Sequence, residues 1–163
     1  MRRALCPGTF DPVTLGHLDI VERAAMLFDE VVVAVALNPD KGYGPLFTIE
    51  ERVEFIHDAV AHLTNVMVRP FDTLLVEFAQ MNDAHVIIKG LRAVTDFEHE
   101  FQMAQLNYRL DKDIETMFIM SIPEYAYLSS SAVREIAQHG GTVRGLVPDA
   151  VCEALAARLN QSH

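Results

Sequence analysis

The feature that most constrains the fold is an unbroken apolar run, Val31 to Leu37, in which valine dominates. β-Branched residues favour strands, and a strand that is apolar at every position has both of its faces buried. Such strands are typical of parallel sheets covered by helices on both sides. The run therefore predicts an α/β fold with a parallel sheet.

Strand-like and helix-like patterns alternate along the rest of the chain. Capping-box sequences at Thr48–Glu51 and Thr95–Glu98 predict two helix starts, and Asp72 predicts a cap for a third helix. The expected strands are residues 4–6, 31–37, 66–68, 84–89 and 114–121. The expected helices are residues 16–28, one that follows Thr48, 73–81, one that ends near Leu110, one between the serines at 129–131 and the glycines at 140–141, and one from 148 through 159.

Five strands separated by helices predict a Rossmann-like, doubly wound five-stranded parallel sheet. A length of 163 residues suits a single domain, and half of the residues are apolar, which is enough for one sizeable core. We therefore expect residues 1–163 to form one domain. Ligands of such sheets bind beyond the carboxyl ends of the strands, so the candidate site loops begin at Pro7, Asn38, Phe71, Lys89 and Pro123.

The formal net charge of -10 disfavours a duplex nucleic-acid binder, which needs a basic face. The two cysteines, Cys6 and Cys152, have no metal-ligand spacing and are expected to be buried free thiols in a reducing cytoplasm. The apolar stretches are too short for a signal peptide core or a membrane span. We expect a cytoplasmic protein with no nucleic-acid partner, no membrane partner and no protein-bound metal.

The loop between the first strand and the first helix, Pro7 to His17, carries the most informative pattern. Backbone N–H groups and the positive end of the helix attract an anion there, and Gly16 lets a phosphate approach the backbone closely. A lone histidine at a helix start usually makes only a local hydrogen bond. Gly8 and Thr9 in the same loop favour a functional role for His17.

This loop does not have either of the commonest phosphate-binding patterns. The G-x-G-x-x-G pattern is missing from it, and no G-x-x-x-x-G-K-[ST] segment occurs in the chain. A hydride-transfer enzyme and a P-loop phosphatase are therefore less favoured. The segment Thr14-Leu15-Gly16-His17 instead matches the x-x-G-H signature of the nucleotidyltransferase superfamily.

Further candidate anion-binding side chains follow later strands. Lys89 closes a predicted buried strand and Arg92 stands at the next helix entrance, where phosphate binding and simple solvation are about equally favoured. Glu100, inside that helix, taken alone is typical of an exposed carboxylate. Lys41 lies in a glycine- and proline-rich loop and is either a surface lysine or a residue that closes on a phosphate.

The segment Tyr125 to Arg134 places three serines at a helix start. Hydroxyls and N–H groups at such a start suit an anion, and Arg134, three residues after Ser131, shares that end of the helix. An ordinary serine cap beside a salt-bridged arginine explains this spacing at least as well.

In combination, these segments resemble the bacterial phosphopantetheine adenylyltransferase family over about residues 3–159. The motifs that carry the resemblance are Pro7 to Pro12, Thr14 to His17, Gly90 to Val94 with Asp96 to Glu98, and Ser129 to Ser131. The resemblance implies transfer of AMP from ATP to 4′-phosphopantetheine, with Mg²⁺, to give dephospho-coenzyme A and pyrophosphate in coenzyme A biosynthesis. It also implies a homohexamer that coenzyme A inhibits by feedback.

The same resemblance implies the site residues. The expected ATP contacts are Thr9, Phe10, His17, Gly90, Leu91, Arg92, Glu100, Tyr125, Ala126, Tyr127, Leu128, Ser129, Ser130 and Ser131, and the expected phosphopantetheine contacts are Thr9, Lys41, Leu75 and Lys89. The residues expected to act in catalysis are His17, Thr9, Lys41 and Arg92. His17 is expected to donate to the α-phosphate, while Arg92 and the serines hold the β- and γ-phosphates.

The chain departs from the family pattern at three places. Lys89 replaces a common arginine, which keeps the charge but loses the bidentate fork. Tyr125 replaces a frequent tryptophan, and the loop after Lys41 is slightly longer, with Gly42-Tyr43-Gly44.

Three other interpretations share parts of these patterns. A related adenylyl- or cytidylyltransferase would use the same loop on nicotinamide mononucleotide or a phosphorylated alcohol. A nucleotide-binding regulator would bind ATP without catalysis, and the combined presence of His17, Lys41, Lys89 and Arg92 argues against it. A class I aminoacyl-tRNA synthetase would need a longer chain and a basic surface.

Overall fold

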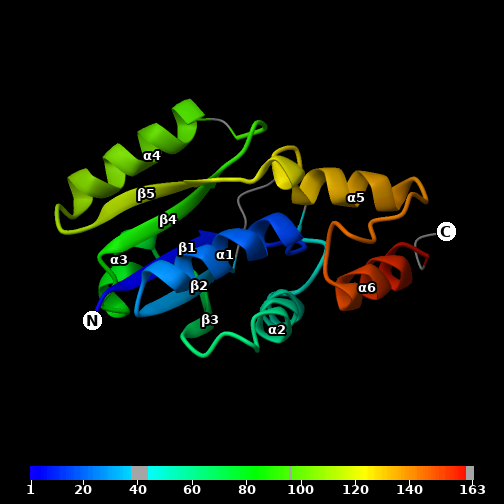
Figure 1. The fold of residues 1–163 in the computed structure, drawn as a ribbon, viewed down its shortest axis with the longest axis horizontal. Coiled ribbons are helices and arrows are strands. Elements are labelled where there is room, and N and C mark those ends of the chain that lie inside the picture. Colours follow the sequence, from blue (N-terminus) through cyan, green and yellow to red (C-terminus); the bar gives the residue numbers. More distant parts are fainter. Residues whose placement is uncertain (38–43, 96, 161–163) are drawn as a thin grey trace.

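The computed structural model describes residues 1–37, 44–95 and 97–160. Five strands, β1 (Arg3–Gly8), β2 (Glu30–Ala36), β3 (Val66–Phe71), β4 (Val86–Leu91) and β5 (Glu115–Met120), form one parallel sheet in the order β3-β2-β1-β4-β5 (Figure 1). The helices are α1 (Leu15–Leu27), α2 (Ile49–Ala59), α3 (Leu75–Met81), α4 (Phe97–Leu110), α5 (Ser130–Gln138) and α6 (Asp149–Asn160), with a short 3₁₀ helix at Pro123–Tyr125. The predicted α/β fold with a Rossmann-like five-stranded parallel sheet is confirmed.

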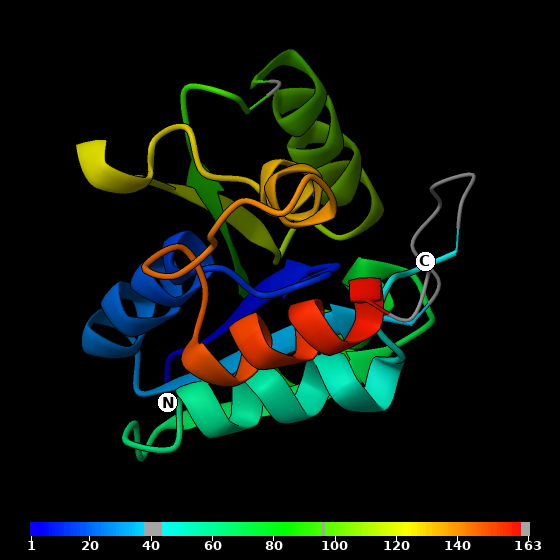
Figure 2. The same cartoon turned by 90° about the vertical axis from the view of Figure 1, so that its right-hand side faces the viewer.

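Helices cover both faces of the sheet, which explains why β2 is apolar throughout. Val31, Val33 and Val35 pack on one face with apolar residues of α1, α2, α5 and α6, and Figure 2 shows α6 lying alongside α2. Val32 and Ala34 pack on the other face with residues of α3. All five of these β2 residues are fully buried. The alternation of side chains along a strand thus supplies two cores from one run.

The strand order reverses beside β1, and this reversal creates the room for a site. β1 pairs with β2 from Arg3 to Gly8, but it pairs with β4 only at Ala4 and Leu5. Beyond Leu5 the two central strands part at their carboxyl ends. In open α/β sheets this is where ligands bind.

Three strands are longer than predicted at their carboxyl ends. β3 continues to Phe71, and its added residues pair with β2. β1 continues through Pro7 and Gly8, which pair with β2, and β4 continues to Leu91. Lys89 therefore lies within β4 rather than at its end. The reason is that parallel pairing with a neighbouring strand extends past the apolar residues that predict the strand core.

The helix starts depend on their caps. Thr48 and Glu51 form the predicted capping box of α2. α3 ends at Met81 as predicted, but its predicted start is wrong, because the helix begins at Leu75 and its N-cap, Leu74, makes no side-chain cap hydrogen bond. Asp72 therefore does not cap it. The second predicted capping box includes Asp96, which lies outside the described residues.

Among the described residues, no helix combines the length and apolar character needed to cross a membrane.

Candidate active site

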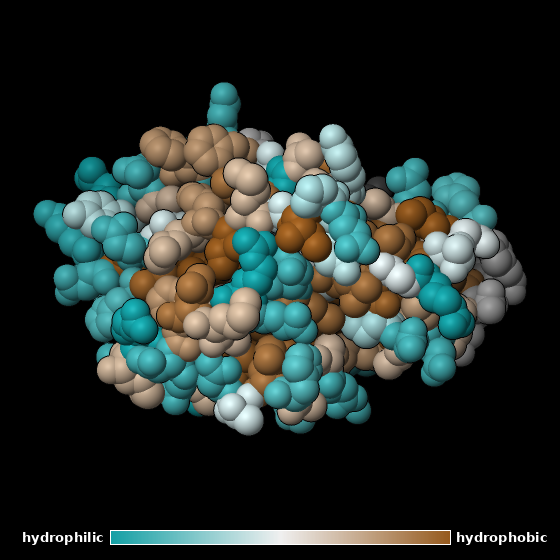
Figure 3. Space-filling model, in the orientation of Figure 1, coloured by the Kyte–Doolittle hydropathy of each residue, from teal (hydrophilic) through white to brown (hydrophobic). Residues whose placement is uncertain are grey.

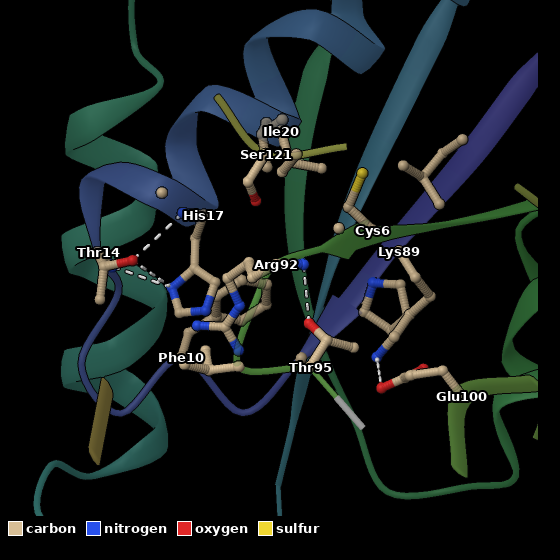
Figure 4. A pocket seen from close by; sticks show the side chains of 17 residues that line it. Cys6, Phe10, Thr14, His17, Ile20, Lys89, Arg92, Thr95, Glu100 and Ser121 are labelled. Atoms are coloured by element: carbon tan, nitrogen blue, oxygen red, sulfur yellow. Dashed lines mark hydrogen bonds and ion pairs between the residues drawn. The ribbon is translucent and has the colours of Figure 1, made fainter. Parts of the chain in front are cut away.

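A cavity of about 250 Å³ opens where β1 and β4 part. Its walls come from the end of β1 and the loop after it, the first turns of α1, the end of β4 with the following loop, α4, and the residue after β5 (Figure 4). The lining residues are Cys6, Pro7, Gly8, Phe10, Thr14, Gly16, His17, Ile20, Val21, Ile88, Lys89, Gly90, Arg92, Val94, Thr95, Glu100 and Ser121. The predicted loops at Pro7 and Lys89 thus meet in one site.

His17 is held in this cavity by the cap of its own helix. The backbone N–H of Thr14 donates to Nδ1 of His17 at 3.0 Å, and the backbone N–H of His17 donates to the Thr14 hydroxyl at 3.2 Å. These two bonds form a capping box in which histidine takes the usual place of glutamate. Because Nδ1 accepts, the neutral ring carries its proton on Nε2, so this nitrogen is a donor.

Phe10 fixes the other side of the His17 ring. The two ring centroids are 5.0 Å apart at an interplanar angle of 79°, an edge-to-face contact. Figure 4 shows both rings beside Arg92. His17, for which the sequence predicts a functional role, is therefore held from two directions at the N-terminus of α1.

Lys89 and Glu100 form an ion pair in the cavity wall. Their charged groups are 3.6 Å apart, and both side chains are about a quarter exposed. Figure 4 shows the ammonium from β4 meeting the carboxylate from α4. Glu100 is the one carboxylate that lines the cavity within the described part of the chain.

Arg92 joins two of the predicted segments. Its guanidinium donates to the carbonyl of Leu128, and the N–H of neighbouring Ala93 donates to the carbonyl of Ala126 at 3.0 Å. Burial lowers the pKa of Arg92, and the nearby Glu100 carboxylate opposes that shift. The loop after β4 is thus tied to the turn before α5.

The serine turn, Ser129 to Ser131, is not among the residues that line the cavity. The Ser129 hydroxyl accepts from the N–H of Ala132 and caps α5, and the Ser130 hydroxyl donates to the carbonyl of Pro12 at 2.8 Å. The Ser131 hydroxyl accepts from Arg134 at 3.3 Å. The serine cap of the alternative interpretation is therefore present, but among the described residues Arg134 donates to the Ser131 hydroxyl and the Asp11 carbonyl rather than to a carboxylate.

The remaining predicted ATP contacts lie next to the cavity. A Cβ atom on Gly16 would lie 3.3 Å from the Cβ of Tyr125, so these two residues pack closely and a side chain at position 16 would crowd them. Leu128 is buried in the core beside the site. A neighbouring hollow, which shares Arg92 and Ser121 with the cavity, is lined by Leu91, Ala126 and Tyr127 among others.

Thr9, one of the predicted catalytic residues, is not among the residues that line the cavity. Thr9 stands between the lining residues Gly8 and Phe10, and its carbonyl accepts a hydrogen bond from Arg52. Lys41 lies outside the described residues, as do Gly42 and Tyr43.

A second cavity of about 200 Å³ adjoins the first and shares Lys89 and Glu100 with it. Its walls are mostly apolar and include the predicted Leu75. Besides Lys89 and Glu100, three polar residues line it: His99, Asn107 and Thr116. Asn107 is 9% exposed, and the buried hydroxyl of Thr116 has no hydrogen-bond partner among the described residues.

Asn107 and Thr116 are not predicted as site residues from the sequence. Asn107 follows Met103 by four residues and precedes Leu110 by three, and all three line the second cavity from α4. An asparagine within the apolar period of a helix is a signal for a buried polar contact. Thr116 has no such signal, because threonine is common in strands.

Comparisons with known proteins agree with this geometry. The cytidylyltransferase-like family matches residues 5–136. The phosphopantetheine adenylyltransferase of Symbiobacterium thermophilum is 59% identical over 148 residues, which cover 91% of this chain and 90% of the relative. Those of Caldanaerobacter subterraneus subsp. tengcongensis and Clostridium tetani are 53% and 51% identical, and the alignments cover 99% and 98% of this chain and 100% and 99% of the relatives.

Cys6 lines the cavity but is predicted to be chemically inert in the folded protein. Burial raises the pKa of its thiol to about 12, although the nearby Lys89 lowers it in part. Since the thiolate is the reactive form, the folded protein holds almost none of it near pH 8. A Cys152→Ser variant should therefore show no fast reaction with a disulfide reagent at pH 8, and one reacting thiol in denaturant. A native rate close to the denatured rate would contradict this.

Proposed function

We propose, from the premise that the chain belongs to the phosphopantetheine adenylyltransferase family, that it transfers AMP from ATP to 4′-phosphopantetheine. The products are dephospho-coenzyme A and pyrophosphate, a step of coenzyme A biosynthesis. The observation that carries the proposal is the pair of adjoining cavities that share Lys89 and Glu100. One is rich in anion-binding groups, and the other is mostly apolar with a few polar groups.

The first cavity suits the phosphates of ATP. The N-terminus of α1 supplies a positive potential, and His17, Lys89 and Arg92 add donors around the same space. His17 is assigned to the α-phosphate, because its Nε2–H is a fixed donor at that helix end. Arg92 is assigned to the β- and γ-phosphates, and the serine turn supports it through the Leu128 carbonyl.

The second cavity suits the pantetheine arm of the acceptor. That arm is a flexible chain with apolar stretches and amide groups, and it needs apolar walls with a few matched polar partners. Leu75 contributes an apolar wall, and Asn107 and Thr116 offer an amide and a hydroxyl. Lys89 stands where the two cavities adjoin, so it is assigned to the acceptor phosphate, with Thr9 and Lys41 as further contacts.

The chemistry follows from holding both substrates in line. An oxygen of the acceptor phosphate attacks the α-phosphorus of ATP, and the bond from that phosphorus to the bridging oxygen breaks. Pyrophosphate leaves, and negative charge builds on the α-phosphate oxygens. No covalent enzyme intermediate is needed, because positioning and electrostatic stabilisation by His17 and its neighbours lower the barrier.

Mg²⁺ is proposed to arrive with ATP rather than to occupy a protein cage. No group of three or more potential metal ligands occurs in the described part of the chain. Glu100, the carboxylate in the cavity wall, is paired with Lys89. This donor set fits an ion carried by phosphate oxygens and water, where it would neutralise phosphate charge.

Coenzyme A is proposed as a feedback inhibitor, because it carries the same pantetheine arm as the acceptor and would compete for the second cavity.

We also propose the cytoplasm as the place of action and a homohexamer as the assembly. Figure 3 shows apolar side chains gathered over α4 and β5. Phe97, Phe101, Leu106, Met117 and Met120 are all more than 40% exposed there, an apolar surface typical of subunit contacts.

The assembly is testable by light scattering after gel filtration. The expected mass is about six times the 18.2 kDa of one chain. Leu106→Glu should lower this mass, because it places a charge in the apolar surface of α4. Met26→Glu, at an exposed apolar position of α1, is the matched control and should leave it unchanged. A wild-type protein that elutes as a monomer would rule the hexamer out.

The acceptor is identified by pyrophosphate release. With ATP and Mg²⁺, the protein should release pyrophosphate with 4′-phosphopantetheine and not with nicotinamide mononucleotide or a simple phosphorylated alcohol. Chelation of Mg²⁺ should abolish the release. Activity with nicotinamide mononucleotide alone would assign a different acceptor, and ATP binding without pyrophosphate release would leave only a nucleotide-binding role.

The role of His17 is tested by His17→Ala. Loss of one transition-state donor typically costs about 10²–10³-fold in kcat, so turnover should fall by that order while the KM for ATP changes by only a few-fold. His62→Ala removes an exposed histidine of the same protein and should have no such effect. Turnover within a few-fold of the wild type would show that His17 does not serve the α-phosphate.

A further inference from the structure

Arg52 is a buried cation to which the proposed reaction assigns no role. It lies on α2, among residues that alternate between charged and apolar, but it is only 1% exposed. A fully buried arginine is uncommon, because removing its charge from water is costly unless its donors are satisfied.

Within the described residues, all of the hydrogen bonds that Arg52 donates go to backbone carbonyls. One terminal nitrogen donates to the carbonyls of Thr9 and Ala36, each at 2.8 Å, and the other to that of Leu37 at 3.3 Å. Nε donates to the carbonyl of Phe47 at 3.2 Å. Arg52 therefore binds together the loop after β1, the end of β2 and the entrance to α2.

Burial lowers the pKa of the Arg52 guanidinium, and the carboxylates of Asp11 and Glu50 oppose this shift. Asp11 belongs to the same network. It is buried, and its two carboxylate oxygens accept from the N–H groups of Leu46 and Phe47 at 2.7 and 2.9 Å. The loop after β1 is thus fixed to the entrance of α2 by both residues.

The contact with Thr9 matters because of the residue that follows it. Phe10 has a φ of 52°, in the left-handed region that residues other than glycine seldom adopt. Such a conformation persists only where the surroundings hold it. Arg52 holds the Thr9 carbonyl, directly before Phe10, and Arg134 donates to the carbonyl of Asp11, the next residue along the chain.

The conformation of Phe10 determines the shape of the cavity wall. Its ring packs edge-on against His17 at 5.0 Å, and a Cβ atom on Gly8 would lie 2.9 Å from its Cζ atom. A different backbone at Phe10 would withdraw the ring from His17 and release one side of the imidazole.

We infer that Arg52 is a positioning residue for adenylyl transfer, and that Arg134 is its counterpart on the other side of Phe10. Together they hold the Thr9–Asp11 backbone in the conformation that seats Phe10 against His17. This inference rests on the proposed function for its effect on turnover. Its structural part, the link from Arg52 to the His17 ring, does not depend on any activity.

The test uses Arg52→Lys, which keeps the charge and the aliphatic stem but lacks the planar fork that reaches four carbonyls. Misplacement of a reacting group by about 1 Å can cost on the order of 10²-fold in rate. We expect kcat to fall by about that factor, with the KM for ATP changed only a few-fold. In the ligand-free protein, the ring-proton NMR resonances of His17 should shift, because the Phe10 ring current acts on them.

Arg158→Met is the matched control. Arg158 donates to the Leu46 carbonyl at 2.9 Å, pairs with Glu51 and lies over the Phe47 ring, so it braces the same entrance to α2 from α6. Loss of the Arg158 guanidinium should lower the thermal stability but leave kcat and the His17 resonances unchanged. A purely structural Arg52 would behave in the same way as this control.

Unshifted His17 resonances in Arg52→Lys would overturn the inference, and so would an unchanged kcat. If Arg52→Lys does not fold, Arg134→Met decides by the same two measurements, since it releases the other side of Phe10 from a partly exposed position. A wild-type protein that releases no pyrophosphate would refute the proposed function alone, because the His17 resonances still decide whether Arg52 positions the ring.

Discussion

The site depends first on how β1 is paired. β1 lies between β2 and β4 and bonds to β2 along its whole length, whereas it bonds to β4 at only two positions. Parallel strands have their carboxyl ends at one edge, so the parting of β1 and β4 opens a space that the N-terminus of α1 borders. A single feature of the sheet therefore brings a helix dipole, His17 and Lys89 to one place.

The features predicted from sequence are those that depend on near neighbours. The apolar run of β2 predicts a strand covered on both faces, because an apolar side chain at each position indicates that this position is buried. The capping residues Thr48 and Glu51, which predict the start of α2, are three positions apart, so this helix start is encoded locally. Strand ends are less well encoded, since Pro7 and Gly8 extend β1 only because β2 offers pairing partners there.

The parts that sequence reasoning could not supply depend on distant partners. Arg52 stands close to Glu50, Glu51 and Glu54, a pattern typical of an exposed helix face, and its partner Thr9 is 43 positions away. The Ser130 hydroxyl reaches Pro12 across 118 positions. No periodicity reports such contacts, because they exist only once the sheet order has brought the loops together. For that reason the contact by which Ser130 braces the loop after β1 is not predicted from the sequence, and the expected contacts of the serines with the phosphates stay a prediction.

The charge of the cavity explains how an acidic chain suits an anionic substrate. Of the described charged residues only Asp11 and Arg52 are buried, so the net charge of -10 lies mostly on the surface, where physiological salt screens it over about 8 Å. Inside the cavity the balance is reversed, since Glu100 faces Lys89, Arg92 and a helix N-terminus. An ammonium has three donors and a flexible stem. Lys89 can therefore keep its contact with Glu100 while it binds a phosphate. A lysine at this position, where the family commonly has arginine, is thus compatible with the reaction.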